Sequence, residues 1–257
     1  MRILILGHYE IASNYAIGML VQHLVQNTRL DLKLALSGHG DAKLENKDQS
    51  AEQSDFVRLA QYERLLCTEL DAGIDRLGLN VMGFKQIEHI INKPIEIIAK
   101  PNHADGLVKL GEWAPDLIIS IRYRKILHEQ AIAIPPMGVI NLHSGLLPEY
   151  RGAMATFWSM LNKENNYGST LHFITDRGID TGAIIDRSSH KLDLSENYLS
   201  NVLSLYPAGV SMIVDCVNKI VKNRRIDVQT PNNQGKYYSF PSILELEKFN
   251  NLGLKLF

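Results

Sequence analysis

The chain opens with the apolar run Ile3-Leu4-Ile5-Leu6, which stops at Gly7. A short run of this kind, without polar alternation, is typical of a strand that is buried on both faces. Residues 12–26 follow with apolar side chains at helical spacing, and residues 32–36 form a second short apolar run. A strand, a glycine, a helix and a second strand indicate a βαβ unit. We therefore predict an α/β fold with a doubly wound, mostly parallel sheet.

The same two patterns continue along the chain. Apolar runs predict further strands at residues 95–99, 116–121, 139–142, 170–175 and 183–186. Helical spacing predicts helices at residues 56–77, 103–112, 153–161 and 196–221. The last helix should be interrupted at Pro207, because proline removes a hydrogen bond inside a helix. Residues 38–55 are polar and predict a solvated loop.

The chain length favours one large domain. We predict a catalytic domain at residues 1–225 and a short C-terminal arm at residues 226–257, with a short helix from Ser242. An arm of this length is too short to form an independent domain.

Composition limits the classes of function. Hydrophobic residues make up 45% and charged residues 21% of the 257 residues, as in soluble globular proteins. A net charge of −1 gives no electrostatic reason to expect nucleic acid as a partner. Cys67 and Cys216 lie in apolar patterns and predict buried free thiols in a reducing compartment. The chain has neither a signal-like start nor an apolar stretch near the ~20 residues that span a membrane, so we predict a cytoplasmic protein without a membrane partner.

Polar side chains gather in the stretch Gly138-Val-Ile-Asn-Leu-His-Ser-Gly-Leu-Leu-Pro-Glu-Tyr-Arg-Gly152. Asn141 and His143 lie two residues apart, so both point to the same face of the predicted strand. They lie near its carboxyl end, where open α/β sheets bind their ligands. A lone histidine there is usually incidental, but the turn Asp176-Arg-Gly-Ile-Asp180-Thr-Gly182 adds a carboxylate.

Asn141, His143 and Asp180 are the candidate catalytic residues. A carboxamide and an imidazolium can both donate hydrogen bonds to the oxyanion that forms when a nucleophile adds to a carbonyl. A carboxylate beside the imidazole would orient it and favour its protonated form. Through a bound water, Asp180 could also relay a proton away from the attacking group.

Two other kinds of site are less well supported. Ser144 could be a nucleophile, but it faces away from His143 and no G-x-S-x-G turn is present. His143, His172 and Asp180 could bind a metal ion, but they lack a recognised ligand spacing, so we predict no metal.

The turn after the first strand, residues 7–14, lacks G-x-G-x-x-G and does not support a dinucleotide. The helix start there could still bind a phosphate, and His8 is a candidate acceptor-binding residue. Arg122, Arg124 and Lys125 follow a predicted strand and enter a predicted loop and helix. Cations are unfavourable at the start of a helix, which favours an anionic ligand beside them.

Several motifs in this order resemble the folate-dependent formyltransferases. They are Asn141-Leu-His143, Ser144-Gly-Leu-Leu-Pro148, Tyr150-Arg-Gly152, Thr170-Leu-His-Phe173 and Gly178-Ile-Asp180-Thr-Gly182. The family includes the glycinamide ribonucleotide, methionyl-tRNA and sugar-nucleotide N-formyltransferases. The motifs span about residues 116–186, and the order of N-x-H, L-L-P and D-x-G is specific.

The resemblance implies a Rossmann-like formyltransferase fold and a reaction. N10-formyltetrahydrofolate would donate a formyl group to a primary amine, without a metal. Asn141 and His143 would stabilise the tetrahedral oxyanion. Asp180 would pair with the histidine and help to remove the proton of the attacking amine.

The resemblance also implies binding residues. On the cofactor side, the backbone of Ile126 and Leu127 would contact the pterin ring. Arg124 and Lys125 would belong to the same wall, and Asp176, Gly178 and Ile179 would close the opposite one. Tyr150, Arg151 and Gly152 would lie beside the acceptor, and His172 would give structural support.

The resemblance identifies the acceptor less directly than it identifies the reaction. A methionyl-tRNA enzyme would carry a further barrel domain and a basic surface. A glycinamide ribonucleotide enzyme would open with the motif G-x-G-S-N, which residues 7–14 match only in part. A formyltetrahydrofolate hydrolase would have a regulatory domain before the catalytic one, which here begins at Met1.

Residues 120–127 and the chain length look most like the sugar-nucleotide group, which implies a nucleotide-linked 3-amino or 4-amino deoxysugar as acceptor. A glycinamide ribonucleotide or hydroxyornithine-like amine, the hydrolase and a non-catalytic folate- or nucleotide-binding module remain alternatives. A homodimer is compatible with the sequence, which does not fix the oligomeric state. The sequence assigns no role to residues 56–92.

Overall fold

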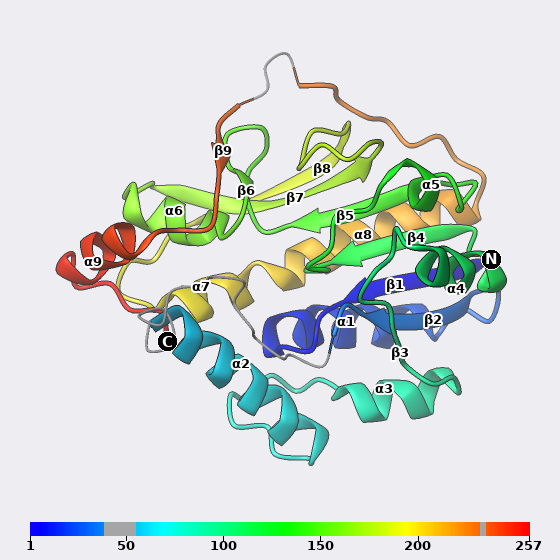
Figure 1. Ribbon diagram of the computed structural model, residues 1–257, viewed down its shortest axis with the longest axis horizontal. Helices are drawn as coiled ribbons and strands as arrows, with labels where there is room; N and C mark the ends of the chain where they lie inside the picture. The colour runs from blue at the N-terminus through cyan, green and yellow to red at the C-terminus, as the bar shows by residue number, and fades with distance from the viewer. Residues whose placement is uncertain (39–54, 232–234) are drawn as a thin grey trace.

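The computed structural model describes residues 1–38, 55–231 and 235–257 (Figure 1). The strands are β1 (Arg2–Gly7), β2 (Asp31–Leu36), β3 (Glu96–Ile97), β4 (Leu117–Ile121), β5 (Val139–His143), β6 (Arg151–Gly152), β7 (Asn166–Ile174), β8 (Ile184–Lys191) and β9 (Tyr237–Tyr238). The helices are α1 (Ile11–Leu24), α2 (Asp55–Asp71), α3 (Phe84–Ile91), α4 (Ala104–Trp113), α5 (Glu129–Ile132), α6 (Ala155–Leu161), α7 (Tyr198–Ser204), α8 (Tyr206–Val221) and α9 (Ile243–Asn251).

The main sheet has seven strands in the order β3-β2-β1-β4-β5-β7-β8. The first five are mutually parallel, whereas β5–β7 and β7–β8 pair antiparallel. This arrangement confirms the predicted doubly wound, mostly parallel sheet. The predicted strands from β1 to β8 are all present, although β3 is only two residues long.

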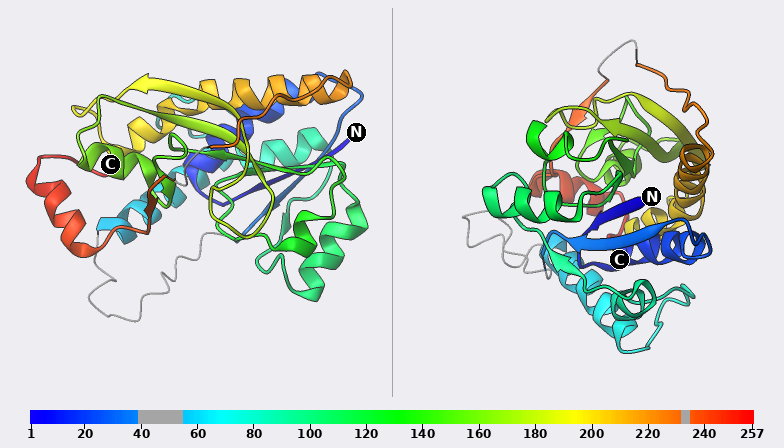
Figure 2. Two further views of the ribbon diagram at one scale, coloured as in Figure 1. Left: turned by 90° about the horizontal axis from the view of Figure 1, so that it is seen from above. Right: turned by 90° about the vertical axis from the view of Figure 1, so that its right-hand side faces the viewer.

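Both faces of the sheet are covered by helices (Figures 1 and 2). Ile3 and Ile5 of β1 point into a core shared with α1, α2, α7 and α8. Leu4 and Leu6, which alternate with them, point into a second core beneath α4 and α5. Because successive side chains of a strand point to opposite faces, a strand between two helical layers must be apolar throughout. The apolar run in β1 therefore follows from its central position.

The predicted break at Pro207 is present. Helix α7 ends at Ser204, and Pro207 lies in the first turn of α8, where its missing N–H has no intrahelical partner to lose. The combined run Tyr198–Val221 has 24 residues and a mean hydropathy of 1.2, so by length and composition it could span a membrane. This corrects the prediction that no apolar stretch approaches that length. Of its most apolar window, 61% is buried inside the fold, and α8 packs against α1 and β7 as a core helix does.

Two local predictions were wrong, and one helix was missed. Helix α2 ends at Asp71, and Gly73 follows it with a φ of 84°. Helix α3 was not predicted, although Phe84, Ile87 and Ile91 lie at helical spacing; Phe84 and Ile87 are its buried residues. Residues 122–128 form no helix, since α5 begins at Glu129, so the cations lie in the loop that leaves β4. Most of the predicted 38–55 loop lies outside the described residues.

The C-terminal arm packs onto the rest of the chain. Strand β9 pairs in parallel with β6, through Arg151 with Tyr237 and Gly152 with Tyr238. Helix α9 begins after Ser242, whose side chain and Glu245 form a capping box. Phe249 of α9 is fully buried and stacks on Phe157 of α6, with ring centroids 4.5 Å apart. The domain boundary between residues 225 and 226 stays a prediction.

Candidate functional site

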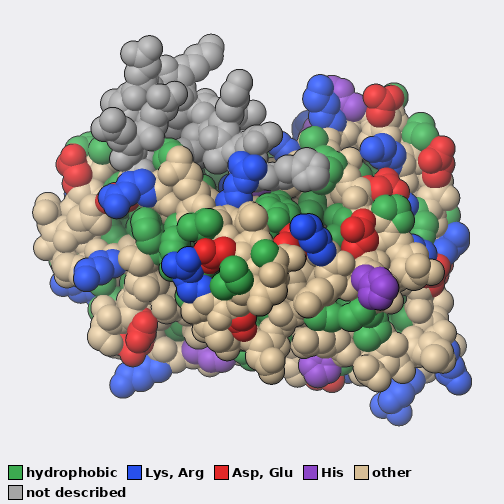
Figure 3. All heavy atoms as spheres, turned by 90° about the horizontal axis from the view of Figure 1, so that it is seen from below, with side chains coloured by type: hydrophobic (Ala, Val, Ile, Leu, Met, Phe, Trp, Pro, Cys, Tyr) green, Lys and Arg blue, Asp and Glu red, His purple; other side chains and the backbone are tan. Residues whose placement is uncertain are grey.

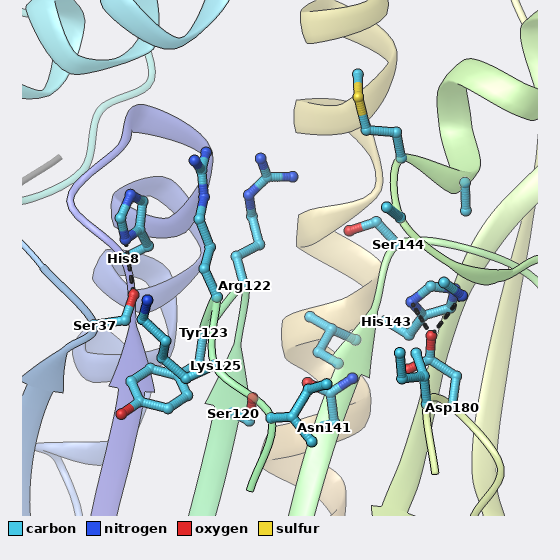
Figure 4. A pocket seen from close by; sticks show the side chains of 18 of the residues that line it. His8, Ser37, Ser120, Arg122, Tyr123, Lys125, Asn141, His143, Ser144 and Asp180 are labelled. Carbon is cyan, nitrogen blue, oxygen red and sulfur yellow. Dashed lines mark hydrogen bonds and ion pairs between the residues drawn. The ribbon is translucent and has the colours of Figure 1, made fainter. Parts of the chain in front are cut away.

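A cavity of about 960 Å³ lies at the carboxyl ends of the parallel strands (Figure 4). Its lining includes the residues that directly follow four of these strands, namely His8, Ser37, Arg122 and Ser144. Carboxyl ends of parallel strands meet at one edge of a sheet, where α/β proteins bind ligands. The pocket therefore lies where the sequence predicts it.

The three candidate catalytic residues lie together in this pocket, as predicted. The carboxylate of Asp180 faces two histidines, with Oδ2 3.4 Å from His143 Nδ1 and Oδ1 3.4 Å from His172 Nε2. Asn141 Nδ2 lies 3.1 Å from His172 Nε2. Asn141 and His172 are direct partners across the antiparallel β5–β7 pair. His172, expected only to give structural support, is thus in contact with two of the three candidates.

The ring of His143 is held from both sides. Its Nε2 lies 2.6 Å from the backbone carbonyl of Tyr150, and its Nδ1 faces Asp180. A carbonyl and a carboxylate both accept hydrogen bonds, so an imidazolium would donate to both. The Tyr150 carbonyl could not be predicted from side-chain patterns, because it is a backbone group of the loop that follows β5.

Asp180 is strongly acidic in this environment. Burial alone would raise its pKa, but His143, His172 and the Gly152 amide lower the pKa of this carboxyl to about 2. The Gly152 N–H donates to Asp180 Oδ2 at 2.8 Å. Asp180 is therefore a carboxylate across the physiological pH range.

Two loops that approach the pocket from different parts of the chain are joined by hydrogen bonds. Arg151 Nε donates to the carbonyl of Ile179 at 3.0 Å, in addition to the bond from the Gly152 amide to Asp180. Within the second loop, the Gly178 amide donates to Asp176 Oδ1 at 2.6 Å. Of the residues predicted beside the acceptor, His8 and Gly152 line the cavity. Tyr150 and Arg151 are not among the lining residues, and the Tyr150 hydroxyl donates to Glu164 at 2.6 Å.

Gly152 gives a testable link between the arm and the site. It has a φ of 100°, and a Cβ there would overlap the Tyr238 carbonyl. We expect Gly152→Ala to push β9 away, to weaken the amide contact with Asp180 and to lower the free energy of unfolding by ~1–3 kcal/mol. Urea unfolding measures this loss. Gly111→Ala is the control, because a Cβ there meets nothing within 4 Å, and an equal effect in both variants would contradict the prediction.

The predicted cofactor wall also borders the pocket, with Arg124, Lys125, Ile126 and Leu127 on one side and Asp176, Gly178 and Ile179 on the other. Asn102 fixes the first of these segments: its Nδ2 donates to the Ile126 carbonyl at 2.8 Å, and its Oδ1 accepts from the His128 amide at 2.8 Å. No motif pointed to Asn102, since its partners lie about 25 residues away.

An internal carboxylate lies among the cations of the pocket. Glu10 is 2% exposed and forms ion pairs with Arg122 and Arg124. Burial opposes the charge, but the two guanidinium groups lower the pKa of Glu10 to about 2. The cations that suggested an anionic ligand therefore already have a protein anion beside them.

His8 lies at the same end of the pocket. Its Nδ1 is 2.8 Å from Ser37 Oγ. Burial and the charge of Arg124 lower the pKa of His8 to about 4, so its ring is neutral at physiological pH. A neutral imidazole can give a hydrogen bond to a ligand but no charge.

Metal ligation finds no support in the part of the chain that the structure describes, where no cluster of three or more His, Cys, Asp or Glu side chains could hold an ion. The two thiols, Cys67 and Cys216, are free and buried, as predicted. Other pocket residues escaped prediction because they belong to helices and an arm without motifs, among them Phe56, Glu63, Tyr198 and Phe240.

Comparison with known proteins agrees with this site. Residues 98–200 match the family model "Formyl transferase". The bifunctional polymyxin resistance protein ArnA of Wigglesworthia glossinidia brevipalpis is 32% identical over 168 residues, which is 65% of this chain and 25% of that protein. The methionyl-tRNA formyltransferase of Clostridium novyi is 30% identical over 151 residues, 58% of this chain and 47% of that protein. The chain thus spans a quarter to about half the length of these curated relatives.

Solved structures share the fold. A sugar N-formyltransferase from Shewanella sp. FDAARGOS_354 has a TM-score of 0.59 at 17% identity, covering 93% of this chain and 77% of that one. WlaRD, a sugar 3N-formyltransferase solved with dTDP and 5-N-formyl-THF, has a TM-score of 0.59 at 20% identity, covering 93% and 69%. The ordered motifs, the family match over the residues that carry them and the shared Rossmann-like fold agree in supporting the folate-dependent formyltransferase family for this chain.

Proposed function

We propose that this chain transfers a formyl group from N10-formyltetrahydrofolate to a primary amine of a small molecule, and that this acceptor is a nucleotide-linked amino deoxysugar. The observation that carries the proposal is the Asp180 carboxylate, held between His143 and His172 with Asn141 beside them at the pocket. Ligand binding alone needs no such set of oxyanion donors.

The folate donor fits the end of the pocket that lies between two loops. Two loops, residues 124–127 and 176–180, border a cavity of about 960 Å³, within the usual range for small-molecule sites. The backbone of Ile126 and Leu127 and the loop at Asp176, Gly178 and Ile179 would hold the pterin. Bound there, the donor supplies an activated formyl carbon.

Asn141 and His143 stabilise the charge that develops on the formyl oxygen. The Asn141 Nδ2 group carries two hydrogens and lies 3.1 Å from His172 Nε2, so a hydrogen is available for the formyl oxygen. The His143 ring is anchored through Nε2 on Tyr150, which leaves Nδ1–H to be shared between Asp180 and the reacting group. Donors fixed before the reaction are worth more than mobile ones, since they need no reorganisation.

Asp180 acts mainly by its charge. With a pKa of about 2, its carboxylate is a weak base toward the ammonium of the attacking amine. The same carboxylate faces His143 Nδ1 and orients the imidazole ring. Proton removal through a bound water remains its second proposed role.

Two observations support a sugar nucleotide over a tRNA. The neighbours with sugar acceptors in their names cover 93% of this chain. On the face shown in Figure 3, the coloured Lys and Arg side chains are mixed with Asp and Glu and form no basic patch. Methionyl-tRNA is the competing acceptor, because several curated relatives at about 30% identity are methionyl-tRNA formyltransferases.

An acceptor panel tests the proposal. The protein is mixed with 10-formyltetrahydrofolate and, separately, nucleotide-linked 3-amino and 4-amino deoxysugars, glycinamide ribonucleotide, hydroxyornithine and methionyl-tRNA, and tetrahydrofolate release is followed. We expect release with an amino deoxysugar nucleotide. Release without any amine would identify a hydrolase, and release with methionyl-tRNA alone would replace the sugar. Folate binding without release in any mixture would indicate a binding module.

A further inference from the structure

One wall of the pocket is built by elements outside the family motifs. Phe56, Leu59, Ala60 and Glu63 of α2 line the cavity, and their spacing of three, four and seven residues puts them on one helix face. The C-terminal arm adds Tyr237 and Phe240, and the Phe56 and Phe240 rings meet edge to face, with centroids 4.9 Å apart. Helix α2 and the arm therefore form one largely apolar wall, here called the α2 wall.

Glu63 is the exception on this wall. Its side chain is 3% exposed, yet Oε1 has no hydrogen-bond partner. Arg122 Nη2 is 3.7 Å from this oxygen, beyond hydrogen-bond reach. The Ala12 amide at the start of α1 donates a hydrogen bond to the Glu63 carboxylate. An unsatisfied buried acceptor is destabilising, so this oxygen calls for an explanation.

The chemistry of the α2 wall limits its ligand. Apolar and aromatic side chains favour the faces of a ring, whereas one unpaired carboxylate oxygen requires a hydrogen-bond donor. A phosphate would be repelled by Glu63 and Glu10, both of which line the pocket. A neutral ring that carries a hydroxyl, an amine or a ring N–H satisfies both demands.

We propose that the α2 wall is the recognition subsite for the non-reacting ring of the acceptor, with Glu63 Oε1 accepting a hydrogen bond from that ring and Phe56 and Phe240 packing against it. This inference rests on the proposed formyl transfer and narrows its acceptor. It also gives a role to α2, for which the sequence offered none.

Titration of Glu63 gives the subsite a measurable property. Burial and the nearby Glu10 raise the pKa of this carboxyl to about 7, against the opposing charges of Arg122 and Arg124. Tyr198 on α7 and Cys67 on α2 also lie within electrostatic range, and burial keeps both protonated at pH 6–8 by raising the pKa of each. A carboxylate accepts hydrogen bonds more strongly than a carboxyl group, so acceptor affinity should rise as the pH passes from 6 to 8.

The test uses nucleotide-linked 3-amino and 4-amino deoxysugars as probes. Their Kd is measured by calorimetry on protein saturated with 5-formyltetrahydrofolate, at pH 6, 7 and 8. For Glu63→Gln we expect a ~10-fold or greater loss of affinity at pH 8, from the 1.5–3 kcal/mol typical of a hydrogen bond to a charged group, and no pH dependence. In turnover assays KM for the acceptor should rise while kcat stays within a few-fold. The Kd of 5-formyltetrahydrofolate should not change.

Glu69→Gln is the matched control, because Glu69 lies on the same helix and pairs with Arg76 instead of lining the pocket. Phe240→Ala is a second variant, and it should weaken the probes without altering their pH dependence. Probes that bind Glu63→Gln as tightly as wild type, or that do not bind wild type, would overturn the subsite. Probe binding that depends on Glu63, without transfer to any amine, would instead support the subsite and refute the proposed reaction.

Discussion

Turnover is expected to fall by ~10²-fold or more when Asp180 is replaced by alanine, with the fold intact. The carboxylate is the shared partner of His143 and His172 and accepts the Gly152 amide, so its loss removes one contact from each ring. Asn141→Ala and His143→Ala should have effects of the same size, because each removes a donor to the developing oxyanion. Saturating kinetics measure kcat, and circular dichroism checks the fold.

The control for Asp180 is Asp186→Asn on β8, where the carboxylate is exposed and bonds the amide of Arg187. This variant should keep normal turnover. A well-folded Asn141, His143 or Asp180 variant with near-normal kcat would remove that residue from the proposed machinery.

Replacing Glu10 with alanine is expected to lower the free energy of unfolding by ~3–5 kcal/mol, the usual cost of removing one partner of a buried ion pair. Glu10 is the carboxylate between Arg122 and Arg124, and Arg122 is only 19% exposed. Without it, the ion pair that remains for Arg122 among the described residues is the longer one with Glu63, at 3.7 Å. Urea unfolding measures the change.

The ion pairs of Glu10 with Arg122 and Arg124 also predict that the free energy of unfolding depends on pH. The folded pKa of Glu10, about 2, lies below its ordinary value of 4.5, so the stabilisation is present above pH 4.5 and is lost as the pH falls toward 2. Asp31→Ala is the control, because its ion pair with Lys93 is exposed and should contribute no more than ~1 kcal/mol. Equal losses in the two variants would show that the Glu10 cluster adds no stability of its own.

The sheet could be predicted from the sequence because its strands carry a strong local signal. β1 and β4 are buried on both faces, which requires unbroken apolar runs. The helix break at Pro207 was equally local. Helix α3 was missed although Phe84, Ile87 and Ile91 lie at helical spacing, because it is only eight residues long and the pattern covers two turns.

The catalytic trio was predictable because its residues lie in motifs with specific chemistry. Their supporting contacts were not, since these depend on pairing between distant segments. His172 reaches Asp180 through the β5–β7 register, and Glu10 meets Arg122 across 112 positions of the chain. The contact of His143 with the Tyr150 carbonyl could not be predicted, because the carbonyl is a backbone group and sequence patterns describe side chains.

The short β6–β9 pair has a consequence for the order of assembly. Gly152, which holds Asp180, is fixed by Tyr238, a partner that leaves the ribosome long after the sheet strands. Closing the loop between Gly152 and Tyr238 costs conformational entropy. The contacts made by α9 and the arm offset this cost only once they have docked. We therefore expect the Gly152 contact with Asp180 to be fixed only after the arm has docked, later than the sheet.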